Sequence, residues 1–457
     1  MRPRSRRVFV GVSLAALLAT SSLVGQSSAA SLPETAGRQQ AAFPKPLKLD
    51  KKSLGDYVLN WDWKNPAGNS YQPLIKQLRK RVKAKKYATL PSLLDNAKHT
   101  ATRGCASAVK DGGALNKPLK VPAVDWFCLG AKDANTTSWM PQGISGTSDS
   151  SWPGTVNGRR AFAFTWHYHV PNKKNDPLEN GASRVTFLNQ ASVPGKPTKY
   201  RYRNVLMVYP LRTAKGDVTF RSVPIHAGGL VWFHQYLLVT DDSQNSFFNG
   251  VLVFDMHNLL DLANKKLVNT TNPNRVGLYK KTYYTLGYRY VLPLIGIWKT
   301  GGAAACHTES HRPCYEYAGL DRSASPPSLI TGEWCDPGTH PCSTGRVARF
   351  RLVDTKTCRY GCLETRKDGR AHATRVYRQV SPYVQGGDSW GGKYQFTTSY
   401  QSWARRFSAI PNKKPKTFAA GRGAQDLYWN RTGGVRRLWS LTEFPGKGNR
   451  VLYGVKP

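Results

Sequence analysis

Short apolar runs, separated by turns rich in Gly, Pro, Asn and Asp, occupy the chain from about Val121 to its end. Most runs are too short for a helix and are enriched in β-branched and aromatic residues, which is typical of β-strands. No long helical periodicity interrupts them. The pattern predicts an all-β fold for this part of the chain.

The runs recur in a fixed order. A first type combines small and apolar residues: MPQGIS (140–145), IHAGGLVWF (225–233), YRYVLPLIGIW (288–298), SPYVQGGDSW (381–390) and GAQDLYWN (423–430). A second type, such as AFAFTWHY (161–168), and a third, such as GVLVFDMHNL (250–259), follow it. Repeated units of three or four strands indicate a β-propeller, because neighbouring blades must cover each other's faces. We predict five blades, or six if the insertion at 300–327 contains further strands.

The last unit ends after its third strand, at NRVLYGVKP. The missing fourth strand is predicted to come from VPAVDWFCL (121–129), which would close the ring by pairing the two ends of the domain. The predicted organisation is therefore a signal peptide over 1–30, an N-terminal extension over 31–120 and a propeller over 121–457.

The N-terminal regions carry signals of their own. MRPRSRR followed by VFVGVSLAALLA is typical of a secretory signal, and the paired arginines also resemble the twin-arginine export type. Within the extension, Leu74, Leu78 and Val82 recur at helical spacing among lysines and arginines, which predicts a short basic helix. We expect this helix to pack on the domain; binding to an anionic surface is the alternative.

Eight cysteines fall in four close pairs: Cys105 and Cys128, Cys306 and Cys314, Cys335 and Cys342, Cys358 and Cys362. In an exported protein this spacing predicts four local disulfides. Zinc is the alternative, but no pair has the CxxC spacing of a strong zinc motif.

The formal net charge is +40. Such an excess predicts long-range attraction to polyanions, which outside a cell include acidic polysaccharides and anionic wall polymers. Solubility alone is the simpler explanation of the same charge. Nucleic acid is not favoured, since the aromatic residues are spread through the strands. We expect a secreted monomer with no membrane span and no cofactor.

GAQDLYW and LWSLTEFPGKGNRVLYGV, near the C-terminus, resemble secreted bacterial β-propeller proteins of undefined function. A weaker resemblance is to the rhamnose–glucuronate lyases, secreted seven-bladed propellers that act on acidic plant gums. No active-site motif of those lyases can be matched here, so the resemblance implies a fold and a substrate class but no site residue.

In a propeller, the starts of innermost strands and the ends of second strands meet at one end of the central channel. The predicted catalytic residues there are His167, Tyr168, His169, His226 and Arg289. The predicted substrate-binding residues are Gln142, Glu333, Gln385, Asp426 and Glu443. Gln425, Asp241, Asp242 and Ser399 are expected at the same end. A purely structural role, with these groups bonding neighbouring backbone, is the alternative.

Three functions fit these residues. The first is binding of an anionic polysaccharide at this end of the channel, extended to its cleavage by β-elimination. In that reaction Arg289 and Gln142 or Gln385 would neutralise a uronate, a histidine would act as base, and Tyr168 or another histidine as acid. The second is a glycosidase that uses two of the carboxylates Asp241, Glu333, Asp426 and Glu443. The third is a non-catalytic binding or signalling factor held at the cell wall by its basic surface. Zinc or copper on the three histidines is a further alternative. No serine-nucleophile, P-loop or dinucleotide motif is present in the sequence.

Overall fold

The computed structural model describes residues 44–84, 87–116, 120–169, 181–242, 247–264, 266–300, 312–338, 342–355, 357–400, 403–432 and 436–457. The predicted signal peptide lies outside these ranges. Strands dominate them and pair as the blades of a β-propeller, which confirms the predicted class.

Five antiparallel four-stranded units can be followed among the described residues. Their strands, from the innermost outward, are β5 (Trp139–Gly146), β6 (Ala161–Tyr168), β7 (Ser183–Val193) and β8 (Lys196–Arg212) in blade 1. Blade 2 has β10 (Leu230–Phe233), β11 (Tyr236–Asp241), β12 (Gly250–Asp255) and β17 (Tyr290–Lys299). Blade 3 has β18 (Tyr317–Asp321), β19 (Ser328–Gly332), β20 (Arg346–Arg351) and β21 (Ala371–Arg378).

Blade 4 has β22 (Val384–Trp390), β23 (Lys393–Tyr400), β24 (Trp403–Ala409) and β25 (Lys416–Ala419). Blade 5 has β26 (Ala424–Asn430), β27 (Arg437–Thr442), β28 (Val451–Val455) and, outermost, β4 (Ala123–Cys128). The predicted closing strand thus pairs antiparallel with the last strand, with Tyr453 opposite Trp126.

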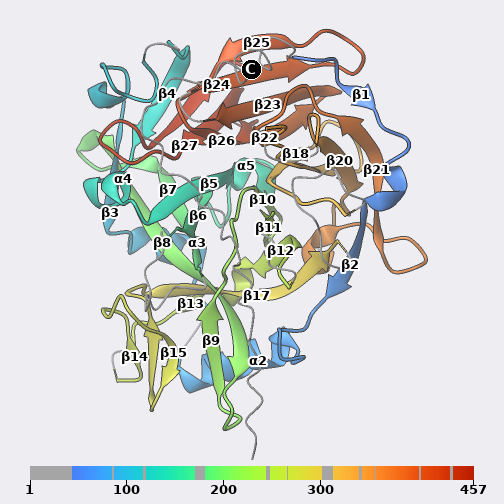
Figure 1. The fold of residues 1–457 in the computed structure, drawn as a ribbon. Helices are drawn as coiled ribbons and strands as arrows, with labels where there is room; N and C mark the ends of the chain where they lie inside the picture. Colours follow the sequence, from blue (N-terminus) through green and yellow to red (C-terminus); the bar gives the residue numbers. More distant parts are fainter. Residues whose placement is uncertain are drawn as a thin grey trace, which may run out of the picture.

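The innermost strands contact one another in the order β5, β10, β18, β22, β26 and back to β5, so the ring closes (Figure 1). Glycines permit this approach. A Cβ atom on Gly229 of blade 2 would lie 2.0 Å from the backbone nitrogen of Ala318 in blade 3. A Cβ atom on Gly386 of blade 4 would lie 2.5 Å from the Cα of Asp426 in blade 5. A side chain at either position would push two blades apart.

The third blade differs from the predicted one. The sequence pattern predicts that YRYVLPLIGIW, a run of the first type, is the innermost strand of this blade, but β17 is the outermost strand of blade 2. The N-terminal segment explains why this outer strand is so apolar. Strand β2 (Val58–Asp62) pairs with β17, and the Trp61 ring packs 5.3 Å from that of Trp298. The true innermost strand is the short β18, within the 300–327 insertion whose residues 301–311 lie outside the described part.

The N-terminal segment runs along the outside of the ring, where Figure 1 shows it in blue. Strand β1 (Lys48–Leu49) pairs with β21, and β3 (His99–Arg103) pairs with both β4 and β8. Helix α2 (Tyr71–Arg81) covers part of the predicted basic helix and buries Leu74 and Leu78 against the domain, as expected. Helix α3 (Leu90–Asp95) follows, with Thr89 at its N-terminus in a capping box.

The remaining elements are small. They are η1 (Leu54–Asp56), η2 (Ala106–Ala108), α4 (Ala131–Asn135), α5 (Thr147–Ser150), β9 (Val218–Ser222), η3 (Met256–Asn258), β13 (Leu260–Asp261), β14 (Val268–Asn269), β15 (Val276–Tyr279), β16 (Thr282–Thr285) and η4 (Tyr360–Cys362). Strands β14 to β16 form a separate three-stranded sheet inserted between the third and fourth strands of blade 2.

Three disulfides join the predicted partners: Cys105–Cys128, Cys335–Cys342 and Cys358–Cys362. The first ties the N-terminal segment to the closing strand β4. Cys314 is also disulfide-bonded, and its predicted partner Cys306 lies outside the described residues. No helix among the described residues is long and apolar enough to cross a bilayer.

Candidate functional site

One end of the ring, which we call the entry face, is where the innermost strands begin and the second strands end. Each blade places one polar residue near the start of its innermost strand: Gln142, His226, Glu316, Gln385 and Gln425. The sequence pattern identified four of these five positions. It missed Glu316 because the innermost strand of the third blade was misassigned. The small residues Ala318 and Gly319, in the motif EYAGLD, were the available signal.

His226 is the centre of a cluster of ionisable groups. Its Nδ1 atom lies 2.8 Å from Asp242 Oδ1 and 3.2 Å from Glu316 Oε2. Its backbone N–H donates to Oδ1 of Asp241 at 2.9 Å. The acidic residues come from two blades, since Asp241 and Asp242 end the second strand of blade 2 and Glu316 precedes the innermost strand of blade 3. The imidazole keeps contact with solvent, with 29% of its side chain exposed, whereas Glu316 is 1% exposed.

A tight backbone turn brings His226 close enough to blade 3 to make these contacts. The two glycines after it lie against blade 3, and a Cβ atom on Gly228 would be 2.0 Å from the backbone oxygen of Glu316. The glycines of the HAGG turn therefore allow the backbones of blades 2 and 3 to approach closely.

Burial and neighbouring charges shift the pKa of both His226 and Glu316. Burial alone would lower the pKa of His226, but Glu316 and Asp242 outweigh it and raise that pKa well above its usual value. Burial and then the adjacent Asp242 raise the pKa of Glu316 to about 8, against the opposing effect of His226. At neutral pH both shifts therefore favour the retention of protons within this cluster.

His167, at the end of β6 in blade 1, lies against this cluster. Its ring centroid is 4.6 Å from that of His226 and 6.2 Å from that of His169. Burial, followed by the positive charges of His226 and His169, lowers the pKa of His167 well below its usual value. Its Nδ1 atom is buried and has no hydrogen-bond partner among the described residues. Tyr168 lies on the other face of β6 and packs 5.1 Å from Trp139, away from the histidines.

Blades 4 and 5 complete the entry face. Gln142 Nε2 donates to Glu443 Oε2 at 3.3 Å, and burial raises the pKa of Glu443. The Gln385 amide, with its nitrogen toward Glu316 Oε1, donates there at 2.8 Å and to Gln425 Oε1 at 3.0 Å. The buried Oε1 of Gln142 has no partner in the described part of the chain.

Three residues predicted for the site are bound by groups outside the His226 cluster. Arg289 precedes β17, an outer strand, and its guanidinium pairs with both carboxylate oxygens of Asp261 at 2.7 and 2.6 Å. This corrects its predicted place on an innermost strand. Glu333 forms a buried ion pair with Arg346, at 2.6 Å. Asp426 is fully buried between blades, where its Oδ2 accepts from the backbone of Ile144 and Leu230.

His226, Asp242 and Glu316 present donor atoms within 4.8 Å of one another, so these three side chains, rather than three histidines, could hold a metal ion. The imidazolium of His226 already supplies a positive charge between the two acids. A divalent cation would therefore have to displace the proton from Nδ1.

The chain matches no protein-family model and no curated protein. Among solved structures it is similar to the β-xylosidase RS223, with 8% identity and a TM-score of 0.32, over 70% of this chain and 92% of that one. It is also similar to the polysaccharide lyase Uly1, with 11% identity and a TM-score of 0.19, over 67% of this chain and 57% of that one. The hemagglutinin-neuraminidase ectodomain of parainfluenza virus 5 gives 8% identity and a TM-score of 0.23, over 92% and 93% of the two chains. Similarities this low carry no inference about activity.

Proposed function

We propose that the protein is a secreted enzyme that hydrolyses a glycan at the entry face, with Asp242, Glu316 and Glu443 as its acid–base groups. The observation that carries the proposal is the contact of one nitrogen, His226 Nδ1, with carboxyl groups of two different residues. Burying ionisable groups costs several kcal/mol each in lost hydration, and strand pairing needs none of them. A desolvated cluster of this kind at an accessible end of a propeller is typical of a functional site.

Hydrolysis fits the charges of this face better than elimination does. A glycosidase needs one carboxylic acid to protonate the leaving oxygen and one carboxylate to activate water or to attack the sugar. Glu316 supports the role of acid because it is buried beside Asp242, so that one of the pair holds a proton. Asp242 or Glu443 supplies the carboxylate. Elimination needs a cation that is available to neutralise a uronate, whereas Arg289 is engaged by Asp261 and the imidazole of His226 is engaged by Asp242 and Glu316.

We further propose that the basic surface holds the protein on anionic wall polymers or acidic polysaccharides after export. The net charge of +40 supports this attraction. The disulfides are compatible with an oxidising, extracellular compartment. In this proposal the surface concentrates the protein on its substrate, and the acidic cluster does the chemistry.

The deciding experiment incubates the mature protein with neutral and uronate-containing polysaccharides and measures reducing ends and ultraviolet absorbance in parallel. We expect new reducing ends without absorbance, lost in Glu316→Gln and Asp242→Asn and retained in Asp95→Asn, a control at an exposed carboxylate. Absorbance from an unsaturated product would establish elimination instead. Binding without any product would establish the non-catalytic factor. Repeating the assay after chelation and after adding Ca²⁺, Mn²⁺ or Zn²⁺ tests whether the reaction needs a metal ion.

A further inference from the structure

A cavity lies between blades 5 and 1, at the ends of strands β6 and β27 that are opposite to the entry face. Strand β6 begins beside Arg160 and ends at the histidines, and β27 begins at Arg437 and ends before Glu443. The cavity has a volume of about 220 Å³. Pockets for drug-sized molecules span roughly 300–1,000 Å³, so this one suits a single sugar ring.

Aromatic side chains form the floor of this cavity. The ring centroids of Phe162 and Trp439 are 4.6 Å apart, and that of Phe127 is 5.8 Å from Trp439 and 5.9 Å from Phe162. These rings come from β6, β27 and the closing strand β4. The site therefore exists only because the ring closes through β4.

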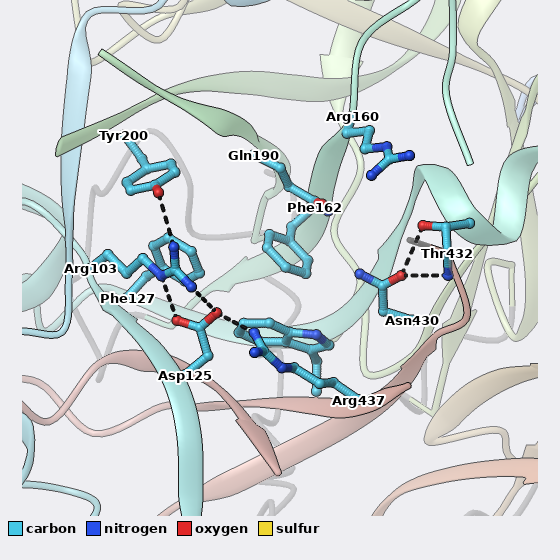
Figure 2. A pocket seen from close by; sticks show the side chains of 11 residues that line it. Arg103, Asp125, Phe127, Arg160, Phe162, Gln190, Tyr200, Asn430, Thr432 and Arg437 are labelled. Atoms are coloured by element: carbon cyan, nitrogen blue, oxygen red, sulfur yellow. Dashed lines mark hydrogen bonds and ion pairs between the residues drawn. The ribbon is translucent and has the colours of Figure 1, made fainter. Parts of the chain in front are cut away.

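Three arginines and one acid lie around the floor (Figure 2). Asp125 is shared between two of them: Arg103 donates to both of its oxygens at 2.7 and 2.8 Å, and Arg437 Nη1 donates to Oδ2. Arg160 is exposed, and its guanidinium has no ion pair among the described residues. With three arginines and one carboxylate, the lining carries a formal net charge of +2.

Two buried polar atoms of the lining lack a partner among the described residues, and both are donors. Arg437 Nε and Trp439 Nε1 are buried and have no hydrogen-bond partner in the described part of the chain. A buried donor without an acceptor is costly, so a ligand that supplies acceptor oxygens would be favoured here. Together with the free charge of Arg160, these donors select an anion rather than a cation.

We propose that this cavity binds a glycuronate residue of an acidic polysaccharide. The apolar face of the sugar ring packs on the aromatic floor, and its carboxylate accepts from Arg160 and Arg437. Arginine suits this role because its planar donors match the two oxygens of a carboxylate. The cavity is separate from the acidic cluster of the entry face, and the inference does not depend on the proposed hydrolysis.

The test is calorimetric titration of the mature protein with glucuronate, with glucose and with inorganic sulfate. We expect glucuronate to bind more tightly than either of the other two. Arg160→Gln should weaken glucuronate binding about tenfold, the loss expected for one charge-assisted hydrogen bond. Trp439→Phe, which keeps an aromatic ring but removes the N–H donor and part of the ring surface of the floor, should weaken it about threefold to tenfold.

Two variants serve as controls. Arg366→Gln removes the charge of another exposed arginine, far along the chain between β20 and β21, and should leave glucuronate binding unchanged. His257→Ala, at an exposed histidine of blade 2, should also leave it unchanged, which excludes a general effect of altered surface side chains. Equal affinity for glucose, equal affinity for sulfate, or an unchanged affinity in Arg160→Gln would each overturn the proposal.

Discussion

The imidazole rings of His167 and His226 lie 4.6 Å apart, although His167 ends the second strand of blade 1 and His226 precedes the innermost strand of blade 2. Neither blade alone contains this pair. The contact arises because closing the ring sets the end of one sheet beside the start of the next. Any change that opens the ring should therefore disturb the candidate site as well as the fold.

Replacing His226 by Ala should destabilise the protein by about 3–5 kcal/mol at pH 7. The change removes the imidazolium from between Asp242 and Glu316, and a buried charge that loses its partner is typically penalised by this amount. Urea unfolding followed by circular dichroism would measure the loss. His257→Ala is the matched control, because His257 is 78% exposed beside Asp255, and its loss should be within about 0.5 kcal/mol. Equal effects of the two changes would contradict the buried cluster.

Replacing Gly229 by Ala should destabilise the ring by at least about 3 kcal/mol or prevent folding. The added Cβ would meet backbone atoms of Ala318 and Tyr317 at 2.0 and 2.3 Å, and backbone cannot give way as a flexible side chain can. Yield of soluble protein and its thermal unfolding would report the effect. Gly55→Ala is the control, since a Cβ at Gly55 would meet nothing within 4 Å. A stable, unchanged Gly229→Ala protein would show that blades 2 and 3 are not in this close contact.

Much of this architecture could be predicted from local pattern. Strand β6 alternates Phe162, Phe164 and Trp166 with Ala161 and Ala163, and all five residues are buried in the observed strand. Because alternate residues of a strand point to opposite faces, the sequence alone predicts which side chains share a face, and it places His167 on the same face as Ala161 and Ala163. The missing fourth strand of the last blade likewise indicated where the closing strand had to be found, since an open ring would leave an edge unpaired.

The order of strands within a blade was harder to predict. A continuous apolar run indicates a buried strand but not whether it is innermost or outermost. The outer strand β17 is buried because β2 covers it, and a Cβ at Gly296 would lie 2.3 Å from the Trp61 ring. That contact is made by a segment that precedes blade 1 in the chain, and no local pattern contains it. The misassignment then placed Arg289 at the entry face in the position that Glu316 occupies.

Removing the Cys105–Cys128 disulfide by changing both residues to Ser should cost about 3 kcal/mol. The chain-entropy estimate depends on the closed loop, which here spans a sequence separation of 23. The shorter Cys335–Cys342 loop, with a separation of 7, should cost about 2 kcal/mol by the same estimate and serves as the comparison. Chemical denaturation of both double variants would test this ranking. A larger loss for the shorter loop would mean that the first bond does not hold the closing strand in place.

Binding to anionic wall polymer should weaken steeply as salt concentration rises. Exposed charges are screened over about 8 Å at physiological ionic strength, so an attraction based on the large positive net charge of the chain should fade as the salt concentration increases. Sedimentation of the protein with purified cell walls at increasing NaCl would measure it. A flat response would contradict the role of the basic surface, and neutral insoluble glycan provides the control for adsorption unrelated to charge.

Stability should fall as pH rises from about 5 to 8, and Asp388 should contribute to that fall. Burial, with help from Asp149 and against the effect of Arg431, raises the pKa of Asp388 to about 8. The folded protein therefore keeps a proton that the unfolded chain, with an ordinary carboxyl pKa, has already released. Because the folded state binds more protons in this window, raising the pH favours unfolding, by at most about 1.4 kcal/mol for each unit of pH.

The variant Asp388→Asn separates this effect from the other titrating groups. An amide stays neutral at every pH, so the variant should lose less stability than the wild type between pH 5 and pH 8. It should also show a constant offset, because Trp429 and Ser389 donate backbone hydrogen bonds to the two carboxyl oxygens and an amide offers only one. Asp95→Asn, at an exposed carboxylate, should leave the slope unchanged. The free energies of unfolding of wild type and Asp388→Asn, taken from denaturation curves, should therefore change differently with pH. If the two plots against pH stay parallel, Asp388 ionises normally, and the charge of Arg431 outweighs the cost of burial.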